Sequence, residues 1–248
     1  MQAVILAGGF GTRISTVVKD VPKPMAPIAG KPFLHYIVEK LIRSSIHEVL
    51  MLTHHKAEII KQYFLDGKNF NHHLHVHYSQ EPKPLGTAGA IFYAWEQLHD
   101  RFLLLNGDTF FDICFQQFYD FFVKEDLQVV MALKKISGPA DRFGTIITDE
   151  FYRVLAIQEK TQISHPTLSS CLINSGIYCF KKEALFSYYL SWKQSPPSPC
   201  SLEKDIFPLL IESEKLYAFK HDGLFIDIGI PDDYAIAQEI LGNKRIHL

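Results

Sequence analysis

Short apolar runs alternate with helix-like segments through the first 125 residues, and this alternation constrains the fold more than any other feature of the chain. It predicts strands at 2–7, 47–53, 74–81 and 101–108, and helices at 33–45, 57–67 and 87–100. We expect Thr87 to open the last of these helices. Strands separated by helices need right-handed crossovers, which place the strands side by side and parallel. The sequence therefore predicts an α/β fold with a mostly parallel sheet.

The pattern changes after residue 125, where strand-like runs follow one another with few helices between them. These runs lie at 127–136, 144–150, 152–160 and 170–180; helical patterns follow at 182–190 and 201–213, then an extended stretch at 215–229 and a closing helix from Pro231. The Pro- and Ser-rich segment 193–201 is typical of a surface loop, not of a linker between domains. We expect one domain over 1–248, with a nucleotide-binding half at 1–125 and a second half at 126–248.

Composition and charge exclude several classes of protein. The chain has 248 residues, 47% of them hydrophobic, and a net charge of −2 without a long basic run, which does not favour a nucleic-acid partner. The first apolar run ends at Gly8, too early for a signal peptide, and no stretch approaches the ~20 apolar residues of a membrane span. The four cysteines form no C-x-x-C pair, which indicates reduced thiols. We expect a cytoplasmic protein with no membrane partner.

A glycine-rich loop, "LAGGFGTR", follows the first predicted strand. Gly8, Gly9 and Gly11 would let backbone N–H groups approach phosphate oxygens at the carboxyl end of the sheet, although a tight structural turn explains them equally well. The loop lacks the G-K-[ST] ending of a P-loop and the third glycine of a dinucleotide fingerprint. Arg13 and Lys23, the latter fixed between two prolines, add two cations, so the segment indicates a triphosphate site.

This loop and several later motifs resemble the signature of the sugar-phosphate nucleotidylyltransferases, also called NDP-sugar pyrophosphorylases. The resemblance runs in order through "LAGGFGTR…PKPM", "EPKPLGTAGA", "LNGDTFFDI", "QEKT", "NSGIY" and "FIDIGIPDDY", nearly the whole chain. It implies the Rossmann-like three-layer αβα fold of the nucleotide-diphospho-sugar transferases, with a mixed, mostly parallel sheet. It also implies Mg²⁺-dependent attack of a sugar 1-phosphate on an NTP, with release of pyrophosphate, for surface polysaccharide such as lipopolysaccharide or capsule.

The resemblance implies a role for each residue that matches a family motif. The catalytic pair is Arg13 and Lys23; the metal ligands are Asp108 and Asp227; the nucleotide-binding residues are Leu6, Gly8, Gly9, Gly11, Thr12, Glu81, Gly86 and Thr87; the sugar-phosphate-binding residues are Gly144, Glu159, Lys160 and Asn174. The half at 126–248 is thereby the sugar-phosphate-binding half. Many relatives have glycine where Ser175 stands, which puts the local loop shape in question.

The residues themselves leave alternatives to several of these roles. Asp108, at the carboxyl end of a predicted strand, suits Mg²⁺, but could simply cap the next turn. Asp227 stands inside an apolar run, where a carboxylate needs a partner. Glu159 and Lys160 could be a surface ion pair, and Gly144 could simply permit a sharp turn into its strand. Asp112, Asp232 and Asp233 are best interpreted as turn and helix-start residues.

Glu81 bears on the choice of nucleobase. Many thymidylyl and uridylyl relatives have glutamine at this position, which both donates and accepts, whereas a carboxylate only accepts. Guanine offers two adjacent donors, N1–H and N2–H, that match two carboxylate oxygens. A surface glutamate before a proline is the alternative. We expect GTP as the donor, and the likeness is strongest to guanylyltransferases acting on D-glycero-D-manno-heptose 1-phosphate, with those acting on mannose 1-phosphate next.

A histidine-rich segment and an aromatic segment each allow two interpretations. His73, His75 and His77 share one face of a predicted strand; three imidazoles could bind zinc, but the wet face of an edge strand is the better interpretation. The aromatic segment 115–124 has helical spacing and is typical of packing in a core or interface. A non-catalytic nucleotide-sugar-binding subunit is the rival function. The sequence leaves the oligomeric state open, a homo-oligomer included.

Overall fold

The computed structural model describes residues 1–11, 18, 20–137, 144–158, 170–194 and 198–242. Four of the candidate site residues lie outside these ranges: Thr12, Arg13, Glu159 and Lys160. Residues 195–197 of the expected surface loop lie outside them as well. Among the described helices, none combines the length and the apolarity needed to cross a bilayer.

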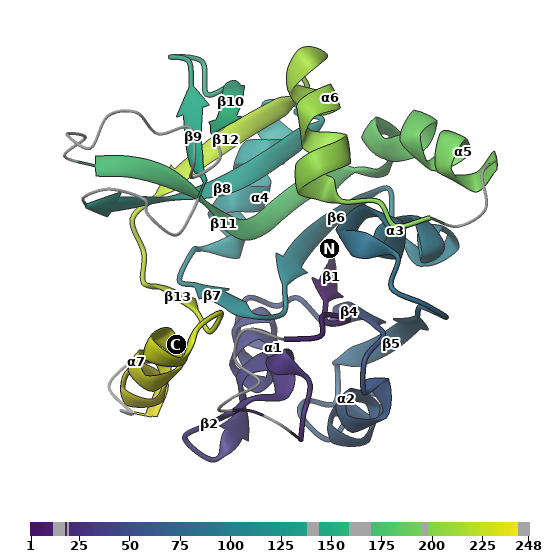
Figure 1. Cartoon of the computed structure of the whole chain (residues 1–248), viewed down its shortest axis with the longest axis vertical. Coiled ribbons are helices and arrows are strands. Elements are labelled where there is room, and N and C mark those ends of the chain that lie inside the picture. Colours follow the sequence, from purple (N-terminus) through teal and green to yellow (C-terminus); the bar gives the residue numbers. More distant parts are fainter. Residues whose placement is uncertain (12–17, 19, 138–143, 159–169, 195–197, 243–248) are drawn as a thin grey trace.

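The first half of the chain forms the parallel part of the central sheet (Figure 1). Its strands lie in the order β6-β1-β4-β5: Arg101–Asn106, Gln2–Leu6, Glu48–Thr53 and His75–Gln80. All three pairings are parallel. The connecting helices are α1 (Phe33–Arg43), α2 (Ala57–Phe64) and α3 (Gly86–Tyr93). The predicted alternation is confirmed: β1, β4 and β6 are buried along almost their whole length, whereas β5 is buried only in part.

The second half adds mostly antiparallel strands to the same sheet. Its strands are β8 (Val129–Ser137), β9 (Thr145–Thr148), β10 (Val154–Gln158), β11 (Ser170–Lys181) and β12 (Leu216–His221). Strand β11 pairs antiparallel with β6, so the sheet is continuous between the two halves. Strand β12 runs parallel to β8. Within the described residues this gives one nine-stranded mixed sheet, as the resemblance implied.

Helices cover both faces of the sheet, which makes three layers. Alternate residues of β1 show why: Ala3 and Ile5 belong to one apolar cluster, whereas Val4 belongs to another on the opposite face. Helix α4 (Phe115–Lys124) buries Phe115, Phe118 and Phe122 in the first cluster. The prediction that this aromatic segment packs in the core is therefore confirmed.

Three of the expected helices are divided or shortened. The helix expected at 87–100 ends at Tyr93 and is followed by a 3-10 turn at Trp95–Gln97. The segment 182–190 begins as a 3-10 turn at Lys182–Leu185 and continues as α5 (Phe186–Gln194). The segment 201–213 begins as a π turn at Leu202–Ile206 and continues as α6 (Phe207–Glu212). In each case the apolar pattern is correct, but it contains no signal for the change in hydrogen-bond spacing.

Two small sheets lie beside the main one. In the first, β7 (Thr109–Phe111) pairs antiparallel with β13 (Phe225–Asp227), and α7 (Pro231–Gly242) follows with Asp232 and Asp233 in its first turn. In the second, β2 (Pro27–Ile28) pairs with β3 (Lys31–Pro32). The β7–β13 pairing brings residues from the two halves of the sequence together at the carboxyl end of β6.

Strand β5 is the terminal strand of the sheet on this side. His75 and His77 are exposed, whereas Leu74 and Val76 are buried. The expected wet face of an edge strand is therefore confirmed at these two histidines.

Candidate active site

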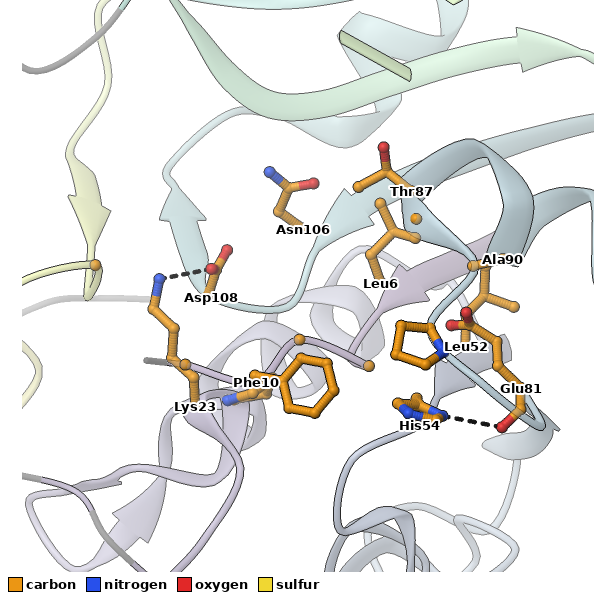
Figure 2. Close-up of a pocket in the computed structure, with 17 residues that line it drawn as sticks. Leu6, Phe10, Lys23, Leu52, His54, Glu81, Thr87, Ala90, Asn106 and Asp108 are labelled. Atoms are coloured by element: carbon orange, nitrogen blue, oxygen red, sulfur yellow. Dashed lines mark hydrogen bonds and ion pairs between the residues drawn. The ribbon is translucent and has the colours of Figure 1, made fainter. Parts of the chain in front are cut away.

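A cavity lies where the parallel strands end (Figure 2). It has a volume of about 460 Å³ and includes residues that follow four different strands: Gly8 after β1, His54 after β4, Glu81 after β5 and Asp108 after β6. Carboxyl ends of parallel strands are where open α/β sheets bind their ligands. Of the candidate nucleotide-binding residues, the described ones all line this cavity: Leu6, Gly8, Gly9, Gly11, Glu81, Gly86 and Thr87.

A second cavity of about 220 Å³ adjoins the first and is lined by Asn174, one of the two described candidates for sugar binding. The two cavities share four lining residues: Lys23, Asn106, Asp108 and Gly229. We call this shared wall the junction. Gly144 lines neither cavity, and a Cβ there would lie 3.1 Å from the Gln158 carbonyl oxygen; its contact with the sugar stays a prediction.

Lys23 lies between two carboxylates at the junction. Its Nζ is 2.6 Å from Asp108 Oδ2 and 3.7 Å from Asp227 Oδ1. Asp227 reaches this position because β13 pairs with β7 in a register that sets Asp227 opposite Thr109. The Lys23 side chain is only 14% exposed, which strengthens its attraction to both acids. The structure thus brings together three of the residues that the resemblance selected.

Asp227 differs from Asp108 in its surroundings. Burial raises the pKa of Asp227, and the like charge of Asp108 raises it further, although Lys23 acts in the opposite direction. Ionised Asp227 is therefore held in the folded chain at a cost, as is common for groups whose task is to bind a ligand charge.

This cost predicts a gain in stability when Asp227 is made neutral. Asp227→Asn, unfolded by heat in EDTA at pH 7, should have a higher Tm than the parent chain, because the raised pKa makes ionisation in the folded state unfavourable. The gain should shrink as the pH falls through the raised pKa of folded Asp227 and vanish below the pKa of Asp227 in the unfolded chain, where both states bind the proton. A lower Tm for the variant at pH 7 would contradict this interpretation.

The donor set at the junction fits a hard cation. The carboxylates of Asp108 and Asp227 both lie near the Lys23 ammonium group, so they can also contact one metal ion. Mg²⁺ prefers such oxygen ligands. Among the described residues, no group of three or more His, Cys, Asp or Glu side chains is arranged to hold a metal. Two carboxylates suit Mg²⁺, which takes its remaining oxygen ligands from water and phosphates.

Glu81 is buried beside the opposite end of the first cavity. Its Oε2 accepts a hydrogen bond of 2.7 Å from the Leu85 N–H, and its backbone oxygen lies 3.0 Å from His54 Nδ1 (Figure 2). Burial raises the pKa of Glu81, while the Leu85 N–H and His54 oppose the shift. Only 7% of the residue is exposed, so the alternative of an ordinary surface glutamate is wrong.

Asn174 is fixed at both ends of its carboxamide. Its Oδ1 accepts from the Gly176 N–H at 2.9 Å, and its Nδ2 donates to the Tyr178 hydroxyl at 2.7 Å. The neighbouring Ser175 is fully buried and donates to the Ala132 carbonyl oxygen at 2.7 Å. A side chain with the hydroxyl of serine is therefore accommodated in this loop where many relatives have glycine.

Thr87 does not open α3, contrary to the sequence-based expectation. The helix begins at Gly86, and the Thr87 hydroxyl donates to Glu203 at 2.9 Å and accepts from the Leu202 N–H at 2.7 Å. The carbonyl oxygen of Cys200 accepts from the N–H groups of Ala88 and Gly89 instead. Segment 200–203 therefore satisfies the first turn of α3, and sequence reasoning could not foresee a cap from more than 100 residues away.

The close contact of this segment with α3 predicts that Gly86→Ala destabilises the chain. Gly86 has φ +77°, and a Cβ there would lie 2.5 Å from the Cys200 carbonyl oxygen. We expect a loss of about 1–3 kcal/mol in the free energy of unfolding, because the new methyl group meets backbone atoms and the backbone conformation is strained. Urea unfolding measures it. Gly9→Ala is the matched control, since among the described residues no atom beyond its chain neighbours lies within 4 Å of the added Cβ. An equal loss in both variants would contradict the prediction.

Several lining residues have no role assigned from the sequence, among them Phe10, His54 and Asn106. The Phe10 ring is 52% exposed and lies 5.8 Å from the ring of His54. Asn106 stands in the "NGD" motif, two residues before Asp108, which was the available signal. His54 directly follows a strand, but a single histidine in that place is too common to single out.

Fold and site together define a class: an α/β protein with a cavity at the carboxyl ends of its parallel strands. A second cavity adjoins the first, and Lys23 and Asp108 line both. The nucleotidyl transferase family profile matches residues 2–244. The chain belongs to the nucleotidyl transferase family. The family that the sequence motifs indicated is thereby confirmed.

Two curated relatives are similar over almost their whole length. The D-glycero-alpha-D-manno-heptose 1-phosphate guanylyltransferase of Aneurinibacillus thermoaerophilus is 38% identical, with 97% of this chain and 98% of the relative covered. The enzyme of the same name from Campylobacter jejuni is also 38% identical, over 94% of this chain and 97% of the relative. Among solved structures, HddC from Yersinia pseudotuberculosis complexed with GMP-PN has a TM-score of 0.78 and 31% identity, covering 96% of this chain and 98% of its own.

Proposed function

We propose that this protein transfers a guanylyl group from GTP to D-glycero-D-manno-heptose 1-phosphate and releases pyrophosphate. The observation that carries the proposal is the junction, where a nucleotide cavity and a second cavity share Lys23 and Asp108. Two phosphorylated substrates bound on either side would meet at this wall. The 38% identity to two heptose 1-phosphate guanylyltransferases supports both the base and the sugar.

The reaction needs no protein nucleophile. The sugar 1-phosphate is ionised at neutral pH, so the protein has to align two anions that repel each other and to neutralise the charge on the reacting phosphates. Lys23, which lies at the junction, supplies a positive charge for these phosphates. Backbone N–H groups of the loop at Gly8, Gly9 and Gly11 supply further donors without charge. When bound by Asp108 and Asp227, Mg²⁺ supplies charge neutralisation at the reacting phosphate.

Three residues outside the described ranges complete the proposed mechanism by family resemblance. Arg13 would hold the leaving pyrophosphate, Lys160 the phosphate of the sugar, and Glu159 the sugar hydroxyls. Asn174, in the second cavity, would contact the sugar as well. Its carboxamide is already oriented by Gly176 and Tyr178, which suits a residue that must recognise one arrangement of hydroxyl groups.

A pyrophosphate-release panel tests the proposal directly. The purified chain is assayed with GTP, ATP, UTP and dTTP, each crossed with D-glycero-D-manno-heptose, mannose and glucose 1-phosphates, with Mg²⁺ and with EDTA. We expect the highest kcat/KM for GTP with the heptose 1-phosphate, and no release in EDTA. Preference for mannose 1-phosphate would move the protein to the second candidate, a mannose-1-phosphate guanylyltransferase. Nucleotide-sugar binding without turnover in any combination would favour the regulatory subunit.

We further propose that the protein is a single nucleotidyltransferase domain that acts in the cytoplasm, on a nucleotide sugar destined for surface polysaccharide such as lipopolysaccharide or capsule. In the described part of the chain no two cysteines form a disulfide, which suits a reducing compartment. Size-exclusion chromatography with light scattering would decide between a monomer and a homo-oligomer.

A further inference from the structure

We infer that Asn106 is a catalytic residue, whose carboxamide Nδ2 donates a hydrogen bond to an oxygen of the reacting phosphates. The inference rests on the proposed function, which places these phosphates at the junction. It adds to that function a neutral donor beside the cation Lys23 and the metal-binding carboxylates.

The position of Asn106 supports this role. Asn106 ends β6 and is one of the four residues that line both cavities. Of these four, Lys23 and Asp108 are engaged with each other at 2.6 Å, and Gly229 has no side chain. Asn106 therefore provides the uncharged polar side chain of the shared wall (Figure 2).

The hydrogen-bonding groups of Asn106 are available to a ligand. Within the part of the chain that the structure describes, the Asn106 carboxamide has no hydrogen-bond partner, although the residue is partly buried. Its polar neighbours in the second cavity do have partners: the Thr109 hydroxyl donates to the Ser175 carbonyl oxygen at 3.3 Å, and Asn174 is satisfied at both ends. No side-chain N or O atom of the described residues is both buried and without a partner, so the Asn106 carboxamide is open to the cavity and available to donate to a ligand.

The Asn106 carboxamide is also held in place by the shape of its surroundings. Gly176 has φ +76°, and a Cβ there would lie 2.6 Å from Asn106 Nδ2 and 2.9 Å from Asn106 Cγ. The Asn106 carboxamide thus rests on the bare α-carbon of Gly176. The Gly176 N–H also donates to Asn174, so the turn at Gly176 orients both Asn106 and Asn174. A donor that is already oriented loses little entropy when the ligand arrives.

The chemistry of the step explains why a donor is useful there. An oxygen of the sugar 1-phosphate forms a bond to the α-phosphorus, and the bond from that phosphorus to the β-phosphate oxygen breaks. Pyrophosphate leaves with the electron pair, and no proton has to move. Negative charge stays on the oxygens around the α-phosphorus, beside the carboxylates of Asp108 and Asp227. A neutral N–H donor stabilises these oxygens without adding to the charge of the site.

Two substitutions separate a phosphate donor from the alternatives. Asn106→Ala removes the hydrogen bond, and we expect kcat to fall about 10²-fold with little change in the KM for GTP. Asn106→Asp keeps the size but replaces the donor by a carboxylate that repels phosphate, so we expect at least a further tenfold loss. Asn69→Asp, the same change on an exposed loop residue, should leave kcat unchanged. Calorimetric titration with a non-hydrolysable GTP analogue reports binding independently of turnover.

The outcomes are distinguishable. If the parent chain transfers no nucleotide in the substrate panel, the proposed function fails before any variant is compared. If the parent is active and Asn106→Asp equals or exceeds Asn106→Ala, Asn106 binds a ribose or sugar hydroxyl, or nothing, and the inference is wrong. The inference is supported if the kcat of Asn106→Asp is lower than that of Asn106→Ala, and if Asn106→Ala binds the GTP analogue with an affinity within threefold of the parent.

Discussion

Asp108→Asn and Asp227→Asn should each lower kcat by about 10²- to 10³-fold, the loss found when one preorganised electrostatic contact is removed from a reacting centre. Both carboxylates lie close to Lys23, whose Nζ is 2.6 Å from Asp108 Oδ2 and 3.7 Å from Asp227 Oδ1. An amide keeps the shape of each side chain but binds a hard cation more weakly. Initial rates of pyrophosphate release, measured over a range of Mg²⁺ concentrations, test the prediction.

Asp112→Asn is the matched control for this experiment. Asp112 is close in sequence to Asp108, but it pairs with Lys40 at 2.6 Å and lines neither cavity. We expect its kcat to stay within about twofold of the parent, since a half-exposed ion pair contributes little. If excess Mg²⁺ restores near-normal turnover to Asp108→Asn or Asp227→Asn, the assignment of both metal ligands falls. The Asp227 variant should be inactive although it is more stable at pH 7, which separates a lost ligand from a damaged fold.

Glu81→Gln should reduce the preference for GTP over UTP and dTTP by roughly ten- to a hundredfold, equivalent to about 1–3 kcal/mol. The carboxylate lines the nucleotide cavity, and its Oε2 already accepts from the Leu85 N–H, which fixes the plane of the group. An oxygen has a second lone pair, so both carboxylate oxygens can still accept from guanine N1–H and N2–H. Glutamine replaces one of these acceptors by a donor, which opposes guanine and suits a pyrimidine imide. Competition between GTP and UTP in one reaction gives the ratio.

The pH dependence of the preference provides a second measurement. Because burial raises the pKa of Glu81, its carboxylate should take up a proton at a higher pH than an exposed glutamate. The preference for GTP should therefore decline as the pH is lowered, and it should not decline in the Gln variant. Glu58→Gln, on an exposed face of α2, is the control for an unrelated loss of charge. A parent chain that uses UTP or dTTP better than GTP would contradict this role of Glu81 and with it the proposed base.

The sequence by itself determined the elements and the family. Strand and helix periodicity are local properties, so β1, β4, β5 and β6 and the helices between them could be predicted within a few residues. Parallel strands separated by helices place their carboxyl ends at one edge, so Gly8, Glu81 and Asp108 could be expected to meet. The family motifs added Asp227 and Asn174, although nothing local to those residues says where they lie. The roles of the individual site residues stay predictions.

The tertiary structure alone decided which distant segments complete the site. Asp227 reaches Lys23 because β13 pairs with β7, and Asn106 is oriented because β11 carries Gly176 past the end of β6. Segment 200–203 caps α3, and the helix begins at Gly86 instead of at Thr87, the start that its sequence favours. Such pairings depend on backbone groups that every residue carries and on packing between segments more than 60 residues apart. A local pattern contains no information about them, because the free energy that selects one partner over another arises only when the whole chain is folded.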